Sequence, residues 1–313
     1  MSIVKRQHYV WRHYLRAWAQ NDKIPTYFTV LKKTEIVGLM GVAQERYFYE
    51  LIDLTIDEET FIKNYINERS PEIVKSLNID FLKLFTSTSR LKRALDKNLK
   101  NINKEAYEEE IRKLEINIME IAHGKIENLG NHLIACQNLE DLKLLEEQDL
   151  LNASIMFLCF QYFRTKKMRN AVIESFKGDK YEDLAIKSWN IFSYILATNL
   201  TKNIALDRNI KFLFHVNHTT EDFITSDQPI FNILNDQIDE NGDVKELEFY
   251  YPISPSKALS ILFRETDEQK FSENNITLSV VEYFNRKVIE NSDFYIFSQS
   301  KNQLEKFIAD NLI

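Results

Sequence analysis

The most apolar stretch of the chain, residues 150–163, reads LLNASIMFLCFQYF. A basic run begins directly after it, at Arg164. The stretch is shorter than the roughly 20 apolar residues that a helix needs to cross a bilayer, and a run of this length is typical of a helix buried in a protein core. It therefore predicts a central core helix and no membrane partner.

Helical periodicity extends outward from this stretch in both directions. Residues 57–168 predict almost continuous helix, and residues 181–201 predict one more. The charged segment 90–120 predicts a solvated helix that ends at 123–124, where a glycine follows a histidine. The expected apolar stripe of this helix consists of Ile111, Leu114, Ile118 and Ile121.

The pattern changes in the last third of the chain. β-branched and aromatic residues predict strands there, at 210–216, 222–226, 247–251, 258–263 and 294–297. A strand at 26–31 and helices at 8–20, 275–290 and 302–309 complete the expected elements. Helices followed by strands favour an α+β class, a large mainly helical part with a late antiparallel sheet.

We expect a single domain that covers residues 1–313. Its helical scaffold spans roughly 50–205, and a sheet-containing part, roughly 206–300, is joined by the N-terminal segment 1–49. The chain has only 6 glycines and 5 prolines in 313 residues, which argues against a β-sandwich or a glycine-rich nucleotide fold.

Charge and cysteine content indicate the cellular compartment and the partners that the protein can have. The formal charge of −7 gives no bulk attraction to nucleic acid, although a local basic groove is compatible with it. Cys136 and Cys159 lie in apolar helical context and are too few for a disulfide framework. These features predict a cytoplasmic protein and leave its oligomeric state open.

Common catalytic motifs are absent from the sequence. It contains no G-x-G-x-x-G, no P-loop, no H-E-x-x-H, no C-x-x-C and no G-x-S-x-G. His215 and His218 form an H-x-x-H pair without a third ligand in the motif, so a divalent metal remains open and no cofactor is identified.

The segment 8–16 is the first candidate for chemistry. His8, Arg12 and Arg16 are spaced four residues apart, which would place them on one side of a helix. Arginines at this spacing can hold a phosphate or carboxylate, and a histidine can transfer protons near neutral pH. The alternative is a terminal helix whose aromatic residues dock on the core.

Two further segments present polar side chains at the ends of buried elements. Gln161 and Arg164 share one face at the end of the core helix, either lining a cleft or tying that helix to the sheet. Ser226 and Asp227 follow a predicted strand and precede Pro229, so they either form a turn or present a carboxylate at the sheet edge.

Together these segments resemble a widespread bacterial family catalogued as domain of unknown function 4238. The likeness spans roughly residues 7–300 and departs at Trp11 and Trp18, where the family tends to carry proline and phenylalanine. The matching residues are His8, Tyr9, Val10, Tyr14, Leu15, Arg16, Gln161, Arg164, Thr165, Ser226, Asp227, Pro229, Pro252 and Ser254.

The resemblance implies no activity, but it implies that the polar residues belong together in a cleft. We expect His8, Ser226 and Asp227 to be catalytic. The residues expected to bind substrate are Arg12, Arg16, Gln161 and Arg164.

Such a cleft suits a bacterial effector enzyme, a nuclease or other hydrolase, that acts on a phosphate-bearing substrate, either nucleic acid or nucleotide. The type of family suggests phage defence or toxicity as its setting. The alternative is a non-catalytic interaction or ligand-sensing module, with a protein partner, whose polar cluster is structural.

Overall fold

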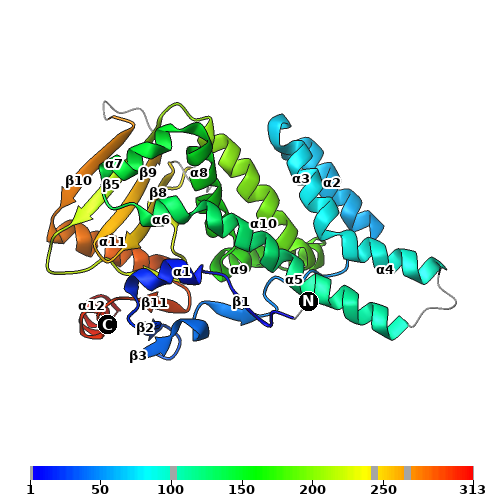
Figure 1. Cartoon of the computed structure of the whole chain (residues 1–313), viewed down its shortest axis with the longest axis horizontal. Coiled ribbons are helices and arrows are strands. Elements are labelled where there is room, and N and C mark those ends of the chain that lie inside the picture. Colours follow the sequence, from blue (N-terminus) through cyan, green and yellow to red (C-terminus); the bar gives the residue numbers. More distant parts are fainter. Residues whose placement is uncertain (1–2, 99–103, 241–245, 264–268, 313) are drawn as a thin grey trace.

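Figure 1 shows the computed structural model of the chain, which describes residues 3–98, 104–240, 246–263 and 269–312. Long helices, a mixed sheet and antiparallel sheets occupy most of these residues, so the α+β class is confirmed. None of the described helices is both long enough and apolar enough to cross a membrane. The division of the chain into a single domain stays a prediction.

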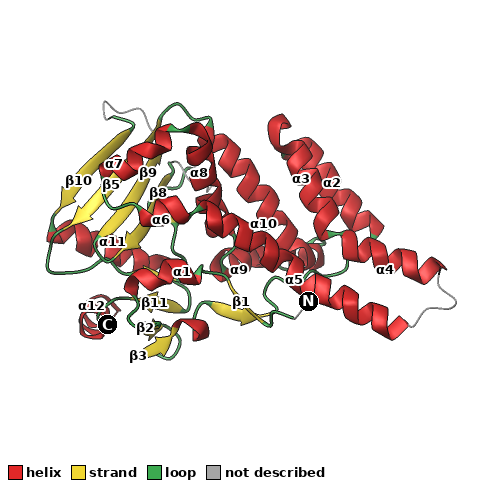
Figure 2. Ribbon diagram, in the orientation of Figure 1, coloured by secondary structure: helices red, strands yellow, loops and turns green. Residues whose placement is uncertain are grey.

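The helical part is built around α8 (Gln148–Phe163), the helix predicted from the apolar stretch. It packs between α5 (Lys104–Leu129) and α10 (Glu182–Ala205). Figure 2 shows the long helices of this part gathered beside the larger sheet. The other helices of this part are α2 (Ile56–Arg69), α3 (Glu72–Phe85), α4 (Ser87–Asn98), α6 (Asn131–Ala135), α7 (Leu139–Lys143) and α9 (Lys166–Ser175).

The larger sheet has five strands in the order β10-β5-β9-β8-β7. Their bounds are β5 (Ile210–Asn217), β7 (Phe231–Asn232), β8 (Glu248–Ser254), β9 (Lys257–Phe263) and β10 (Phe271–Ile276). All pairs are antiparallel except β10 with β5, which is parallel, so the sheet is mixed. The sequence did not predict β10, because its residues read FSENNI and are mostly polar and exposed.

Alternation along β8 explains how this sheet is buried on both faces. Phe249 and Tyr251 join the core that surrounds α8, whereas Tyr250 joins a second core under α11 (Leu278–Asn291). The Tyr250 ring stacks on Phe284 of α11, with centroids 4.3 Å apart. Because successive side chains of a strand point to opposite faces, one apolar strand serves two cores.

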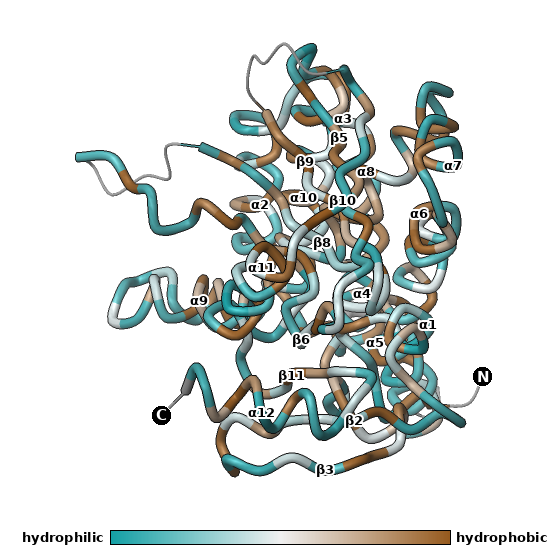
Figure 3. The backbone as a smooth tube through the Cα atoms, turned by 90° about the vertical axis from the view of Figure 1, so that its left-hand side faces the viewer, coloured by the Kyte–Doolittle hydropathy of each residue, from teal (hydrophilic) through white to brown (hydrophobic). Residues whose placement is uncertain are grey.

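A second sheet brings the two ends of the chain together. It has the order β3-β2-β11-β6, built from β2 (Lys23–Phe28), β3 (Lys33–Gly38), β6 (Thr225–Ser226) and β11 (Tyr295–Phe297). In the side view of Figure 3 these strands lie one below another, and α12 (Lys301–Leu312) packs against β2 and β3. The N-terminal segment is therefore part of a sheet and not only a connection. The predicted strand 222–226 is shortened to β6.

The predicted opening helix over 8–20 is wrong. His8 ends β1 (Arg6–His8), which pairs with β4 (Gln44–Arg46), and the helix is limited to α1 (Arg12–Leu15) and a 3-10 turn, η1 (Arg16–Trp18). The backbone stays extended past His8 because the Tyr9 amide donates to the carbonyl of Ala43 at 3.0 Å. His8 therefore does not share a helix face with Arg12 and Arg16.

Two expectations for the charged segment 90–120 are also wrong, and its residues 99–103 lie outside the described part. The helix does not end at 123–124 but continues to Leu129. Leu114 and Ile121 are exposed, so they do not form the predicted stripe. The buried residues of α5 include Ile111, Glu115, Ile116, Asn117, Met119, His123 and Ile126. The buried face of α5 includes polar residues, so the apolar pattern did not identify which side of the helix is buried.

Candidate functional site

The residues expected to share one cleft lie in separate places. Gln161 and Arg164 lie at the end of α8, buried beneath β1. Ser226 ends β6 and pairs with Ile296 of β11, and the next residue, Asp227, contacts the segment before β11. His8, Arg12 and Arg16 line a pocket that is open to solvent.

Arg164 holds the backbone that follows β1. Its Nε donates to the carbonyl of Tyr9 at 3.0 Å, and its Nη2 donates to the carbonyl of His8 at 3.0 Å. Gln161 donates to the same Tyr9 carbonyl at 3.1 Å. The guanidinium also forms an ion pair with Glu127 at 2.6 Å, so its charge is balanced inside the protein. In this arrangement Gln161 and Arg164 position His8 rather than face a ligand.

Asp227 fixes a second stretch of backbone. Its two carboxylate oxygens accept hydrogen bonds from the amides of Asp293 and Phe294, at 2.9 and 2.8 Å. Burial raises the pKa of Asp227 to about 6, and the two amide donors oppose this rise. Ser226 accepts from the amide of Gln228 at 3.1 Å, as expected for a turn. Both side chains are buried, and Arg164 pairs with Glu127 instead of Asp227.

The open pocket lies between the N-terminal segment and α5, with a volume of ≈ 330 Å³. This volume is at the lower end of the range of about 300–1,000 Å³ that is usual for small-molecule sites. The residues that line it are Val4, Arg6, His8, Trp11, Arg12, His13, Arg16, Met40, Glu120, His123, Gly124 and Glu127. We call it the α1–α5 pocket.

Arginines dominate one wall of the α1–α5 pocket. Arg6, Arg12 and Arg16 come from β1, α1 and η1. The ion pair of Arg16 with Asp22 is long, at 3.4 Å, with side chains 50% and 72% exposed, so solvent screens it strongly. Arg12 contacts the sulfur of Met40 and no carboxylate in the described part of the chain. This wall therefore carries positive charge that an anionic ligand can neutralise.

The imidazole of His8 lines the α1–α5 pocket and makes one hydrogen bond. Its Nε2 lies 3.3 Å from the carbonyl oxygen of Leu39. Because a carbonyl only accepts, Nε2 carries the hydrogen and Nδ1 keeps its lone pair. Burial lowers the pKa of His8, with a smaller contribution from the charges of Arg12 and Arg164. The ring is therefore neutral near pH 7 and can accept a proton.

The opposite wall comes from one face of α5. Burial raises the pKa of Glu120 to about 7, with Arg164 opposing and Glu127 adding to the rise. His123 is buried against the rings of Tyr49 and Tyr194, and burial keeps its pKa well below the usual value, so it is neutral.

Sequence reasoning missed these residues of α5. Glu120, His123 and Glu127 are spaced i, i+3 and i+7, which places them on one helical face. That spacing was a usable signal. This spacing was not used in the sequence prediction, because the helix was expected to end at 123–124 and its charged side chains to face solvent.

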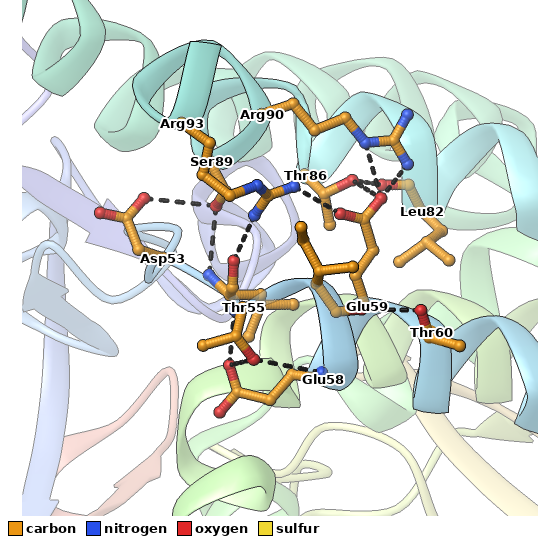
Figure 4. A network of polar contacts seen from close by, with 12 residues as sticks. Asp53, Thr55, Glu58, Glu59, Thr60, Leu82, Thr86, Ser89, Arg90 and Arg93 are labelled. Carbon is orange, nitrogen blue, oxygen red and sulfur yellow. Dashed lines mark hydrogen bonds and ion pairs between the residues drawn. The ribbon is translucent and has the colours of Figure 1, made fainter. Parts of the chain in front are cut away.

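A larger hollow of ≈ 630 Å³ between α2, α3 and α4 is less suited to a ligand. Figure 4 shows why: Glu59 lies between Arg90 and Arg93 and accepts hydrogen bonds from both guanidinium groups. The carboxylate already balances part of their charge. This network joins α2 to α4 and stabilises their packing.

Metal binding finds no support among the described residues, where no group of three or more His, Cys, Asp or Glu side chains is arranged to hold an ion. His215 is buried and lies 3.0 Å from the hydroxyl of Ser260, whereas His218 is exposed. The two histidines do not face a common site.

The comparisons with known proteins give one match. The sequence pattern of a family described as "Protein of unknown function (DUF4238)" matches residues 6–302. No curated protein and no solved structure matches the chain. Since the match covers nearly all of the 313 residues, the chain belongs to this family of proteins of unknown function, DUF4238.

Proposed function

We propose that the chain is a cytoplasmic bacterial effector, a nuclease or other hydrolase, that acts on a phosphate-bearing nucleotide or nucleic acid in the α1–α5 pocket. The observation that carries the proposal is the charge of the pocket. Arg6, Arg12 and Arg16 line one wall, and a carboxyl with a pKa of about 7 lines the other. Guanidinium groups bind phosphate through forked hydrogen bonds.

The roles of the residues follow from their positions. Arg12 and Arg16 hold the phosphate, and Nδ1 of His8 accepts a proton from the attacking water. As water bonds to phosphorus, the P–O bond to the leaving group breaks, and the leaving oxygen takes a proton from solvent. Gln161 and Arg164 keep His8 in place through its backbone and that of Tyr9. Ser226 and Asp227 are not among the residues that line the pocket, so their contribution is to the framework.

The alternative, a ligand-sensing module without catalysis, is favoured by a specific observation. Four of the residues carried by the family pattern, Gln161, Arg164, Ser226 and Asp227, are buried and hydrogen-bonded. A network of this kind stabilises a fold. Under this alternative the pocket binds the same ligand and releases it unchanged.

Adenosine 5′-monophosphate serves as a probe that tests the proposal. We expect isothermal titration calorimetry to show binding to the wild type and at least about tenfold weaker binding to an Arg12→Ala/Arg16→Ala variant, because each charged hydrogen bond contributes about 1.5–3 kcal/mol. Arg208→Ala, at an exposed arginine that does not line the pocket, is the matched control and should bind like the wild type. Equal binding by the wild type and the double variant would reject the proposal.

Turnover separates the two candidate functions. The wild type is incubated with the nucleotide and with RNA, while phosphate release and chain length are followed. Cleavage that is lost in the Arg12→Ala/Arg16→Ala variant supports the enzyme. Binding without cleavage supports the sensing module.

A further inference from the structure

We infer that Glu120 binds the ligand of the α1–α5 pocket in its protonated form and donates a hydrogen bond to a phosphate oxygen. The inference rests on the proposed function and adds a specificity-determining residue to it. Ligand binding then depends on the proton that the Glu120 carboxyl carries.

The position of Glu120 supports this inference. Glu120 lines the pocket from α5, on the helical face that also carries His123 and Glu127, and the arginines of β1, α1 and η1 line the same pocket. Its carboxyl has no hydrogen bond or ion pair within the part of the chain that the structure describes. Glu127, about two turns further along α5, pairs with Arg164, so its carboxylate is already engaged.

The groups that face Glu120 explain why it keeps its proton. Arg164, at the end of α8, lowers the pKa of Glu120, whereas Glu127, which pairs with that guanidinium, raises it. Tyr49 and Tyr194 are buried phenols whose pKa values are raised by burial, so they stay neutral. The remaining titratable or charged groups that line the pocket are Arg6, His8, Arg12, His13, Arg16 and His123. The dominant influence on the pKa of Glu120 is its burial.

A bound phosphate strengthens this preference. An ionised Glu120 would face a phosphate anion across a small pocket, and like charges at such distances repel. A protonated carboxyl instead offers one O–H donor to a phosphate oxygen. If only the protonated form binds the ligand, a pKa of about 7 weakens binding about tenfold between pH 6 and pH 8.

The test measures the affinity for adenosine 5′-monophosphate between pH 6 and pH 8, for the wild type and for Glu120→Gln. Glutamine keeps a donor and cannot ionise, so both proteins should bind similarly at pH 6. At pH 8 the wild type should bind about tenfold more weakly than Glu120→Gln. The difference between the two proteins isolates Glu120, because the ligand and the histidines titrate in both.

Proton uptake provides a readout that needs no variant. Calorimetry of the wild type at pH 7.5, in two buffers with different ionisation enthalpies, counts the protons taken up on binding. We expect a net uptake. No uptake, or the same pH dependence in the wild type and Glu120→Gln, overturns the inference while leaving the binding site intact. No binding by the wild type at any pH overturns the proposed function as well.

Discussion

At the scale of single residues, Glu120 makes the stability of the free protein depend on pH. Its pKa is raised from 4.5 to about 7 in the folded chain, so between these values the unfolded chain binds fewer protons and stability falls as the pH rises. We expect Glu120→Gln to be more stable than the wild type near pH 8, by about 1–2 kcal/mol once solvent screening at the pocket mouth is allowed for.

Urea unfolding near pH 5 and near pH 8 measures this difference. The gain should fall to roughly a quarter of its size near pH 5, because Glu120 stays protonated in the folded state and this pH is only slightly above the value of 4.5 in the unfolded chain. Glu105→Gln, at an exposed position of the same helix, is the control and should show no comparable pH-dependent gain. A gain of equal size at both pH values would contradict the explanation.

Arg164 and Asp227 show what a family resemblance does not reveal about a residue. The sequence singled out Arg164 and Asp227 as important polar residues, and both are buried and fully engaged. It could not indicate that both residues hold backbone groups, because carbonyls and amides of residues such as Tyr9 and Phe294 leave no side-chain signature. A residue that holds backbone in place and one that contacts a ligand look alike in a sequence.

At the scale of elements, the junction of α5 and α6 tests how closely the helices pack. A Cβ built on Gly130 would lie 2.6 Å from ring atoms of Phe157 in α8, whereas one on Gly124 meets nothing within 4 Å. Gly130→Ala should therefore destabilise the protein by about 1–3 kcal/mol through overpacking. Gly124→Ala, in the interior of α5, should stabilise it by about 0.5–1 kcal/mol through helix propensity.

Melting temperatures of the two variants measure the contrast. Each adds a single methyl group near the same end of α5, so they form a matched pair. A loss of stability in Gly124→Ala as large as that in Gly130→Ala would contradict the continuous helix observed here.

The elements that the sequence predicted best are those with a clear period. The core helix α8 and the strands β5, β8 and β9 were found because each is almost uniformly apolar or regularly alternating. α5 was placed in the wrong register because Glu115 and His123 are buried in it while Leu114 and Ile121 are exposed. Tertiary contacts override local pattern there.

At the scale of the whole molecule, the sequence predicted the α+β class but not the way the ends meet. β2 pairs with β11 across most of the chain, and Asp227 positions the turn that leads into β11. Pairing between strands so distant in sequence depends on the assembled fold and has no local signal. His8, Arg12 and Arg16 line the α1–α5 pocket, although the sequence predicted them on one helix face and in a cleft shared with Arg164 and Asp227.

We propose that ligand binding occurs in the α1–α5 pocket, whereas Arg164 and Asp227 serve the framework. Hydrogen–deuterium exchange of the wild type, with and without adenosine 5′-monophosphate, tests this claim most directly. We predict that the nucleotide slows exchange in peptides that cover 8–16 and 120–127, and leaves those that cover 225–229 and 293–295 unchanged. Protection confined to 225–229 and 293–295, or protection nowhere in the chain, would contradict the account.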